Sequence, residues 1–169
     1  MEPKIILLTG LSGSGKSTLS KALKKYFDKN DILNCILDGD ILRLGLNSDL
    51  GLSPKDRDEN IRRTFEVANI LANVGCVVVC AVISPYENMR VKARKASPAP
   101  FYEIYIKCHI DECRKRDPKG LYAKHDSGLI QGMTGLDAPY EIPSNPDLVI
   151  ETDIHSIEDC LQEIVGLIS

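Results

Sequence analysis

The sequence contains a run rich in glycine and serine that ends in a lysine and a serine, Gly10-Leu11-Ser12-Gly13-Ser14-Gly15-Lys16-Ser17, and Thr18 follows it. This G-x-x-x-x-G-K-S spacing is typical of a phosphate-binding loop when it joins a buried strand to the N-terminus of a helix. Backbone N–H groups then converge on phosphate oxygens, the lysine lies against the β- and γ-phosphates, and the serine hydroxyl binds Mg²⁺. A turn rich in glycine and serine could match by chance, but the apolar run Ile5–Leu8 before it and the helix-like segment Leu19–Phe27 after it favour the loop. The run predicts a site for ATP and Mg²⁺, with contacts from Gly10, Ser12, Gly13, Ser14, Gly15, Lys16, Ser17 and Thr18.

Two further carboxylates follow the second predicted strand, in Asp38-Gly39-Asp40. Asp40 could accept a proton from an attacking hydroxyl group, or it could hold Mg²⁺ together with Ser17. The alternative is a turn residue that caps the next helix, and this alternative suits Asp38 better than Asp40. Because phosphoryl transfer needs mainly positioning and neutralisation of charge, one weak base beside Lys16 and Mg²⁺ would suffice.

Strand and helix patterns alternate along the chain on either side of these residues. Strands are predicted at Lys4–Thr9, Ile32–Leu37, Cys76–Ile83, Phe101–Lys107 and Leu148–Glu151. Helices are predicted at Lys16–Lys29, Arg57–Val74 and Asn88–Ala96, from Asp111 onward, and at Ile157–Leu167. This alternation predicts an α/β fold with a parallel sheet of about five strands and helices on both faces. Ligands of such sheets bind at the carboxyl ends of the strands, so the residues that follow the strands are the candidates for the site.

The 169 residues are expected to form a single domain, residues 1–169, with a lid at about 118–140. The lid segment is long, lacks periodicity, and combines Lys119 and Lys124 with several glycines. Segments of this kind are lids or disordered loops, and its composition suits a hinged lid that closes over phosphates.

Composition excludes several other classes of function. The net charge of −3 gives no electrostatic case for binding nucleic acid or an acidic membrane surface. The first apolar run is too short to cross a membrane. The six cysteines contain no C-x-x-C pair, so we expect a reduced, cytoplasmic protein without structural zinc.

Taken together, the blocks that surround these residues resemble the adenylylsulfate kinase family, which phosphorylates the 3′-hydroxyl of adenosine 5′-phosphosulfate (APS) with MgATP. The matching blocks keep the family's order and spacing between residue 5 and about residue 153. Besides the phosphate loop and Asp38-Gly39-Asp40 they are Gly45-Leu46-Asn47, Asp49-Leu50-Gly51, Asp56-Arg57-x-Glu59-Asn60-Ile61-Arg62-Arg63, Ile83-Ser84-Pro85-Tyr86, Asp117-Pro118-Lys119-Gly120-Leu121-Tyr122, Thr134-Gly135 and Pro139-Tyr140-Glu141. The resemblance implies a P-loop kinase that acts on a small nucleotide acceptor and forms a homodimer.

The resemblance also implies roles for single residues. It gives Asp40 the catalytic position, places Arg43, Arg57 and Asn60 against the acceptor nucleotide, and makes Lys119 a candidate contact with phosphate or substrate. Arg57 and Asn60 stand three residues apart and so share one helix face, although that face could instead be solvated and carry local ion pairs. Such ion pairs are a stronger alternative for Arg62 and Arg63. His155 is carried over as a residue that borders the ATP base.

Ser84 has been proposed in the family to form a phosphoenzyme. The sequence supplies no base that would activate its hydroxyl group. Direct in-line transfer from ATP to the acceptor is simpler, so we interpret Ile83 and Ser84 chiefly as acceptor contacts.

The sequence departs from the family pattern at two positions that concern the acceptor base. Leu52 and Met133 stand where the family usually has phenylalanines, in Gly51-Leu52-Ser53-Pro54 and Gly132-Met133-Thr134-Gly135, and those phenylalanines sandwich the adenine of APS. Base–aromatic stacking contributes about 1–3 kcal/mol per base, so the two changes weaken the preference for a purine. APS remains the predicted acceptor, and the alternatives are another 5′-substituted nucleotide, such as cytidine diphosphoramidate, and a non-catalytic nucleotide-binding module.

Overall fold

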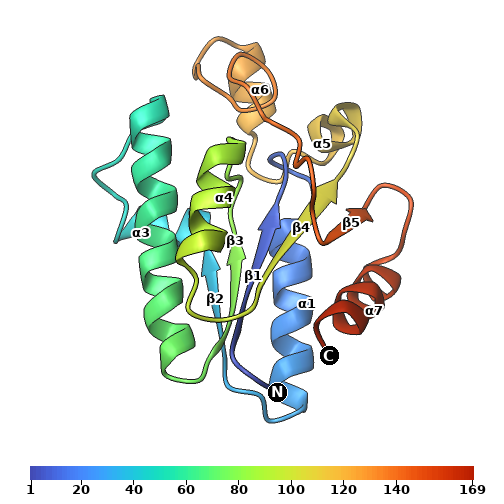
Figure 1. Cartoon of the computed structure of the whole chain (residues 1–169). Helices are drawn as coiled ribbons and strands as arrows, with labels where there is room; N and C mark the ends of the chain where they lie inside the picture. The colour runs from blue at the N-terminus through green and yellow to red at the C-terminus, as the bar shows by residue number, and fades with distance from the viewer.

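Five parallel strands form one sheet in the computed structural model, which describes residues 1–169 (Figure 1). The sheet has the order β2-β3-β1-β4-β5, and every neighbouring pair is parallel. The strands are β1 (Lys4–Thr9), β2 (Asn34–Asp38), β3 (Val77–Ala81), β4 (Phe101–Lys107) and β5 (Leu148–Glu151). This arrangement confirms the predicted α/β fold class. Among the strands, only the ends of β2 and β3 differ from the predicted ranges, by one or two residues.

The central strand β1 is buried along its whole length because helices cover both faces of the sheet (Figure 1). Its side chains alternate between two cores. Ile5 and Leu7 pack with residues of α3 (Pro54–Asn73) and α4 (Glu87–Ala96). Ile6 and Leu8 pack with residues of α1 (Lys16–Lys29) and α7 (Ile157–Ile168).

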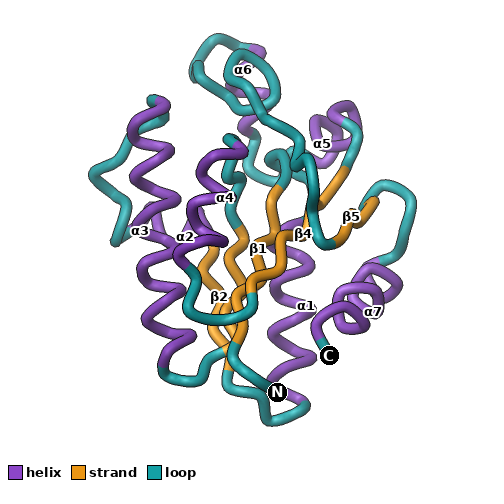
Figure 2. The backbone as a smooth tube through the Cα atoms, in the orientation of Figure 1, coloured by secondary structure: helices purple, strands orange, loops and turns teal.

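Three short helices lie near the carboxyl edge of the sheet, among the loops that follow the strands (Figure 2). They are α2 (Gly39–Leu44), α5 (Ile110–Arg116) and α6 (Leu121–Asp126). The sequence predicted α5 but neither α2 nor α6, because six residues carry too little apolar periodicity to be recognised. Helix α6 belongs to the predicted lid and stands above the sheet in Figure 1.

Helix α3 begins at Pro54, three residues before the predicted start at Arg57. The Ser53 hydroxyl accepts the N–H of Asp56, and Pro54 occupies the first turn, where its missing N–H costs nothing. The earlier start places Arg57 and Asn60 in the first two turns of the helix, close to the carboxyl edge of the sheet.

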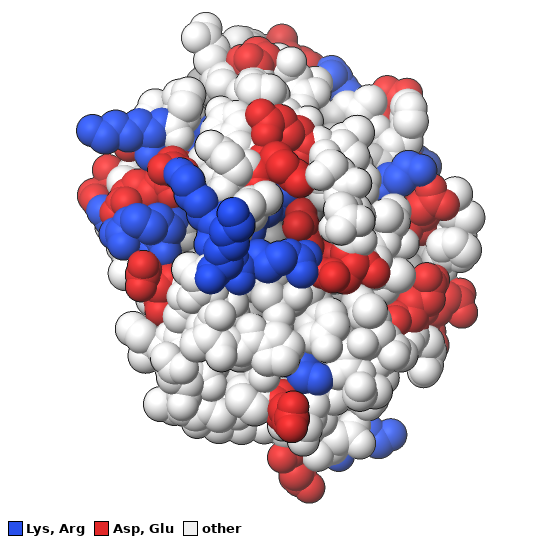
Figure 3. All heavy atoms as spheres, viewed as in Figure 1, with Lys and Arg blue, Asp and Glu red and all other residues white.

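Three further features concern the helices, the surface and the thiols. None of the helices combines the length and apolar character that crossing a bilayer requires. On the face seen in Figure 3, basic side chains lie beside acidic ones rather than forming one large basic surface. All six cysteines are free thiols.

Candidate active site

A cleft of about 820 Å³ opens at the carboxyl edge of the sheet. Its walls come from the phosphate loop, the ends of β2 and β3, the start of α3, the lid, and the segment after β5. The site residues that line it include Ser12, Gly13, Gly15, Lys16, Ser17, Thr18, Asp40, Arg43, Leu52, Arg57, Asn60, Ile83, Ser84, Lys119 and His155. The structure thus brings most of the predicted site residues to one cavity, at the edge of the sheet where they were expected.

The phosphate loop joins β1 to α1, as its spacing predicted, and two of its glycines allow close packing beneath it. A Cβ atom on Gly10 would lie 2.4 Å from the carbonyl oxygen of Ile106, and one on Gly13 would lie 2.8 Å from that of Cys113. Gly13 also has φ 77°, a conformation that side chains disfavour. Neither position accepts a larger residue without moving the loop.

Lys16 lies inside this loop and is 9% exposed. Its ammonium group donates to the carbonyl oxygens of Gly10 at 2.9 Å and Leu11 at 2.6 Å. Burial, and then the positive charge of Lys119, lower the pKa of Lys16 to about 8. A bound triphosphate would reverse this effect, because a nearby anion favours the charged ammonium form.

The structure pairs Ser17 with Asp38, whereas the sequence analysis paired Ser17 with Asp40. The Ser17 hydroxyl donates to Asp38 Oδ2 at 2.7 Å, and Asp38 Oδ1 accepts the N–H of Asp40 at 2.9 Å. Asp38 therefore both caps α2, as its alternative role predicted, and presents a fixed carboxylate beside the loop serine. A serine hydroxyl with a neighbouring aspartate is the pair that holds Mg²⁺ in P-loop enzymes, and hard oxygen donors suit this ion. This pairing of a loop serine with an aspartate at a strand end is the signal in the sequence that points to Asp38.

Asp40 instead forms an ion pair with Lys119 of the lid. Both side chains are about half exposed and line the cleft. The contact joins α2 to the start of the lid, so the lid reaches across the cleft. Asp40 faces the cavity in which a reacting hydroxyl group would lie.

Arg57 connects the start of α3 to Leu52 and to residues 132–134 of the lid segment. Its Nε donates to the Leu52 carbonyl at 2.9 Å, while its two terminal nitrogens donate to Thr134 Oγ1 and to the Gly132 carbonyl. Three of the five N–H donors of a guanidinium group are thus used within the protein. Arg57 lines the cleft as predicted, but its visible role is to hold the lid segment against α3.

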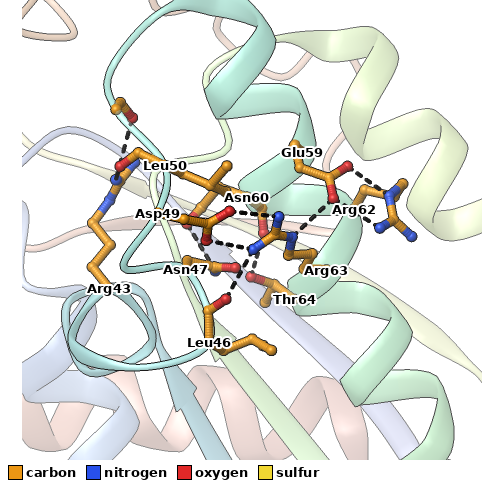
Figure 4. A network of polar contacts seen from close by, with 11 residues as sticks. Arg43, Leu46, Asn47, Asp49, Leu50, Glu59, Asn60, Arg62, Arg63 and Thr64 are labelled. Atoms are coloured by element: carbon orange, nitrogen blue, oxygen red, sulfur yellow. Dashed lines mark hydrogen bonds and ion pairs between the residues drawn. The ribbon is translucent and has the colours of Figure 1, made fainter.

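Loop 45–52 is also fixed to α3 (Figure 4). Asn47 Nδ2 donates to Asn60 Oδ1 at 2.9 Å, while Arg43 Nη1 donates to the Leu50 carbonyl at 3.0 Å. Arg63 binds both carboxylate oxygens of Asp49, at 2.7 and 2.9 Å. These contacts orient Arg43 and Asn60 along the cleft.

Arg62 and Arg63 belong to this surface network rather than to the cleft. Both form ion pairs with Glu59, at 2.7 and 2.8 Å. The predicted alternative, a solvated helix face with local ion pairs, therefore describes these two arginines.

Leu52 and Met133, which were both expected to flank the base, occupy different environments. Leu52 is 49% exposed and lines the cleft. Met133 is 7% exposed and packs with Cys108, Cys113 and Tyr122 in a small core beneath the lid. The apolar side chain of Met133 is drawn into that core, while Gly132 lies near Leu52. Of these two positions, only Leu52 lines the cavity.

Ser84 follows β3 and lines the cleft with Ile83. Its hydroxyl is buried and has no hydrogen-bond partner. No base contacts this oxygen, and an unactivated serine is a weak nucleophile. His155 is exposed and is among the residues that line the cleft.

Comparison with known proteins gives a consistent result. A family model described as adenylylsulphate kinase matches residues 2–151. The chain is 48% identical, over 98% of its length, to an adenylyl-sulfate kinase of Geotalea uraniireducens, of which it covers 80%. It is 49% identical, over 95% of its length, to one of Oceanobacillus iheyensis, of which it covers 81%.

Solved structures agree with these sequence comparisons. The APS kinase of Mycobacterium tuberculosis, in complex with AMPPNP and APS, matches with a TM-score of 0.94 and 42% identity, over 98% of this chain and 97% of that one. A gluconokinase from Sinorhizobium meliloti matches with a TM-score of 0.60 and 18% identity, over 98% of this chain and 91% of that one, and so shares the fold alone.

Proposed function

We infer the activity of this chain from its family, because the chain belongs to the adenylylsulphate kinase family. It is an adenylyl-sulfate kinase, which transfers the γ-phosphoryl group of ATP to the 3′-hydroxyl of APS and yields 3′-phosphoadenosine 5′-phosphosulfate. The observation that carries this conclusion is the meeting of an intact phosphate loop with Asp40, Arg43, Asn60 and Ser84 in one cleft.

The donor half of the cleft is suited to ATP. Backbone N–H groups of residues 10–18 would hold the phosphates, and Lys16 would leave the Gly10 and Leu11 carbonyls to neutralise the β- and γ-phosphates. Ser17 and Asp38 would hold Mg²⁺, which supplies neutralisation of charge on the phosphate oxygens. We place the ATP base near His155, which lines the cleft.

The acceptor half is suited to direct transfer. The 3′-hydroxyl attacks the γ-phosphorus in line, and Asp40 accepts the hydroxyl proton as ADP leaves. Lys119 forms an ion pair with Asp40. When nucleotide enters, the Lys119 ammonium group would move to the negatively charged phosphates. Arg43 and Asn60 would contact the acceptor nucleotide, and Leu52 its base.

The experiment is an acceptor screen with MgATP, followed by chromatography of the nucleotide products. We expect a 3′-phosphorylated product from APS, and no ATP consumption when the acceptor is omitted. Turnover with cytidine diphosphoramidate and not with APS would contradict the proposed acceptor, and Leu52 is the residue that would favour that outcome. ATP binding without turnover of any nucleotide would indicate a non-catalytic module instead.

We further propose that the chain acts as one domain, as a homodimer and in the cytoplasm. The support is its match to one family model over most of its length. Light scattering after size exclusion measures the oligomeric state.

A further inference from the structure

The turn between β3 and α4 holds Ser84 in a conformation that serine rarely adopts. Ser84 has φ 44°, in the left-handed region that favours glycine, and it is 1% exposed. Such a conformation persists in a larger residue only where the surrounding structure enforces it, and these cases cluster at functional sites. The contacts that enforce it here are therefore of interest.

Three successive carbonyl groups of this turn each accept a hydrogen bond from a different part of the chain. The Ile83 carbonyl accepts from the Thr9 hydroxyl, the Ser84 carbonyl from Arg90 Nη1 at 2.7 Å, and the Pro85 carbonyl from the Glu141 N–H at 2.8 Å. The Ser84 hydroxyl remains without a partner and lies in the wall of the cleft. The backbone of the turn is thus fixed from outside, and its free polar group is left for a ligand.

Arg90 is the centre of this arrangement. Its side chain is wholly buried, and its Nε lies 2.7 Å from Glu103 Oε1 on β4. Nη2 donates to the Glu141 carbonyl at 2.8 Å and pairs with Glu87. A single guanidinium group therefore joins the Ser84 turn, β4, and the chain that leaves the lid. A lysine could neutralise a carboxylate here but could not reach these partners together.

We propose that Arg90 is a positioning residue for the acceptor nucleotide: it holds Ser84 in its left-handed conformation and so presents the Ser84 hydroxyl to the acceptor. The proposal rests on the proposed function, because it concerns the acceptor half of the same cleft. Arg90 does not itself line the cavity, so it acts through the Ser84 turn. The ATP half, built on residues 10–18, is not among its contacts.

Arg94 provides a matched control because it lies one helical turn further along α4. Its Nη2 lies 3.6 Å from Glu103 Oε2 and 2.6 Å from Asp147, and its Nη1 donates to the Phe101 carbonyl at 3.0 Å. It shares the Glu103 carboxylate with Arg90 but makes no contact with the Ser84 turn. Arg94→Lys therefore perturbs the same ion-pair network without touching the turn.

The test measures kcat and KM separately for APS and for ATP in the unaltered protein, Arg90→Lys and Arg94→Lys. We expect Arg90→Lys to lower kcat/KM for APS at least tenfold, mainly through KM, and to change KM for ATP less than threefold. Arg94→Lys should change both parameters less than threefold. Equal effects of the two variants on APS and ATP, in proportion to lost thermal stability, would show that Arg90 has only a structural role.

A double-mutant cycle with Ser84→Gly tests the link itself. Glycine adopts the left-handed conformation without a side-chain penalty, so it should need Arg90 less. We expect Arg90→Lys to change kcat/KM for APS less than threefold when it is made in Ser84→Gly. An undiminished tenfold loss in that background would overturn the proposal.

Two further measurements keep the test decisive. If Arg90→Lys does not fold, the pair Arg90→Gln and Glu103→Gln removes both buried charges, and it should show the same selective rise in KM for APS. The unaltered protein tests the proposed function separately. If the unaltered protein does not use APS, the acceptor assignment is contradicted, and the double-mutant cycle is then measured with cytidine diphosphoramidate as the acceptor. A cycle without coupling contradicts the role of Arg90 whichever acceptor is used.

Discussion

Replacing Arg57 with methionine should loosen the lid, because Arg57 makes two of the hydrogen bonds that hold the lid against α3. The acceptors are the Gly132 carbonyl and the Thr134 hydroxyl. Arg57 is 7% exposed, so water replaces these bonds poorly while the lid stays closed. Methionine keeps much of the apolar length of the side chain and removes every donor.

The size of the effect follows from the two bonds. A hydrogen bond from a charged group contributes about 1.5–3 kcal/mol. At the lower figure, the loss of two bonds raises the free energy of the closed lid by about 3 kcal/mol relative to the open lid. Since about 1.4 kcal/mol corresponds to a factor of ten, the open population should rise about 100-fold.

Amide hydrogen exchange measures this population directly. The Gly135 N–H donates to the Ala138 carbonyl at 2.8 Å, and the Gly132 N–H donates to Asp137 at 2.8 Å. Both bonds lie within the turn 132–138 that Arg57 holds, so these amides exchange when the lid opens by local unfolding of that turn. We expect their exchange in Arg57→Met to be about 100-fold faster, down to the limit of an unprotected amide. Unchanged exchange at these two amides would refute the view that Arg57 holds the lid closed.

Arg62→Met is the matched control for this experiment. Arg62 lies on the same helix and is exposed, and it pairs only with Glu59 and Glu66. Exposed pairs contribute about 0.2–1 kcal/mol, and neither partner belongs to the lid. Exchange within the lid should therefore change less than threefold in Arg62→Met.

The other predictions concern the two halves of the cleft. Lys16→Ala should abolish transfer while circular dichroism shows an intact fold, because the loop is positioned by its backbone; near-normal turnover would contradict the role of Lys16. The lowered pKa of Lys16, about 8, predicts that ATP binding takes up protons above pH 8. Calorimetry at pH 8.5 in buffers of different ionisation enthalpy should detect this proton uptake, and Lys16→Ala should lack it. For the same reason, the contribution of Lys16 to stability rises with pH above 8, where the unfolded chain still binds the proton that the folded protein has lost. Asp40→Asn should lower kcat about 10²–10⁴-fold with little change in ATP affinity, because the general base is lost. Ser84→Ala should keep substantial turnover. A trapped phosphoserine in a competent enzyme would contradict direct transfer. Leu52→Phe should raise kcat/KM for an adenine acceptor relative to a cytosine acceptor about fivefold or more, since one stacking face contributes about 1–3 kcal/mol, whereas Met133→Phe should leave this ratio unchanged.

The sheet and the phosphate loop could be predicted from the sequence because their causes are local. Runs such as Ile5–Leu8 are buried on both faces and read as central strands, and the glycine spacing of residues 10–17 leaves few other conformations. The short helices could not be predicted in this way. Helix α2 forms because Asp38 caps it directly at the end of β2. Neither the cap nor the preceding strand produces a periodic pattern within six residues.

The site was predicted as a set of residues, but the pairing of those residues was not. Asp38 and Asp40 are two residues apart, and only the change from strand to helix between them decides which one meets Ser17. Met133 matched a family position, yet its side chain packs in a small core with residues of α5 and α6. Arg90 was missed because its partners lie 3, 6, 13 and 51 residues away, and such contacts leave no spacing pattern.

The two halves of the cleft therefore differ in how the chain builds them, and this has a consequence for specificity. The phosphates of the donor half would lie on one continuous loop, in which Lys16 bonds to its own neighbours. The acceptor half consists of three distant segments held together by guanidinium groups, with Arg57 joining α3 to the lid and Arg90 joining the Ser84 turn to the chain after it. Because those arginines bind mostly backbone carbonyls, the relative positions of the three segments do not depend on which side chain faces the base. A change such as phenylalanine to Leu52 can thus alter the preferred base while the phosphoryl-transfer groups keep their positions.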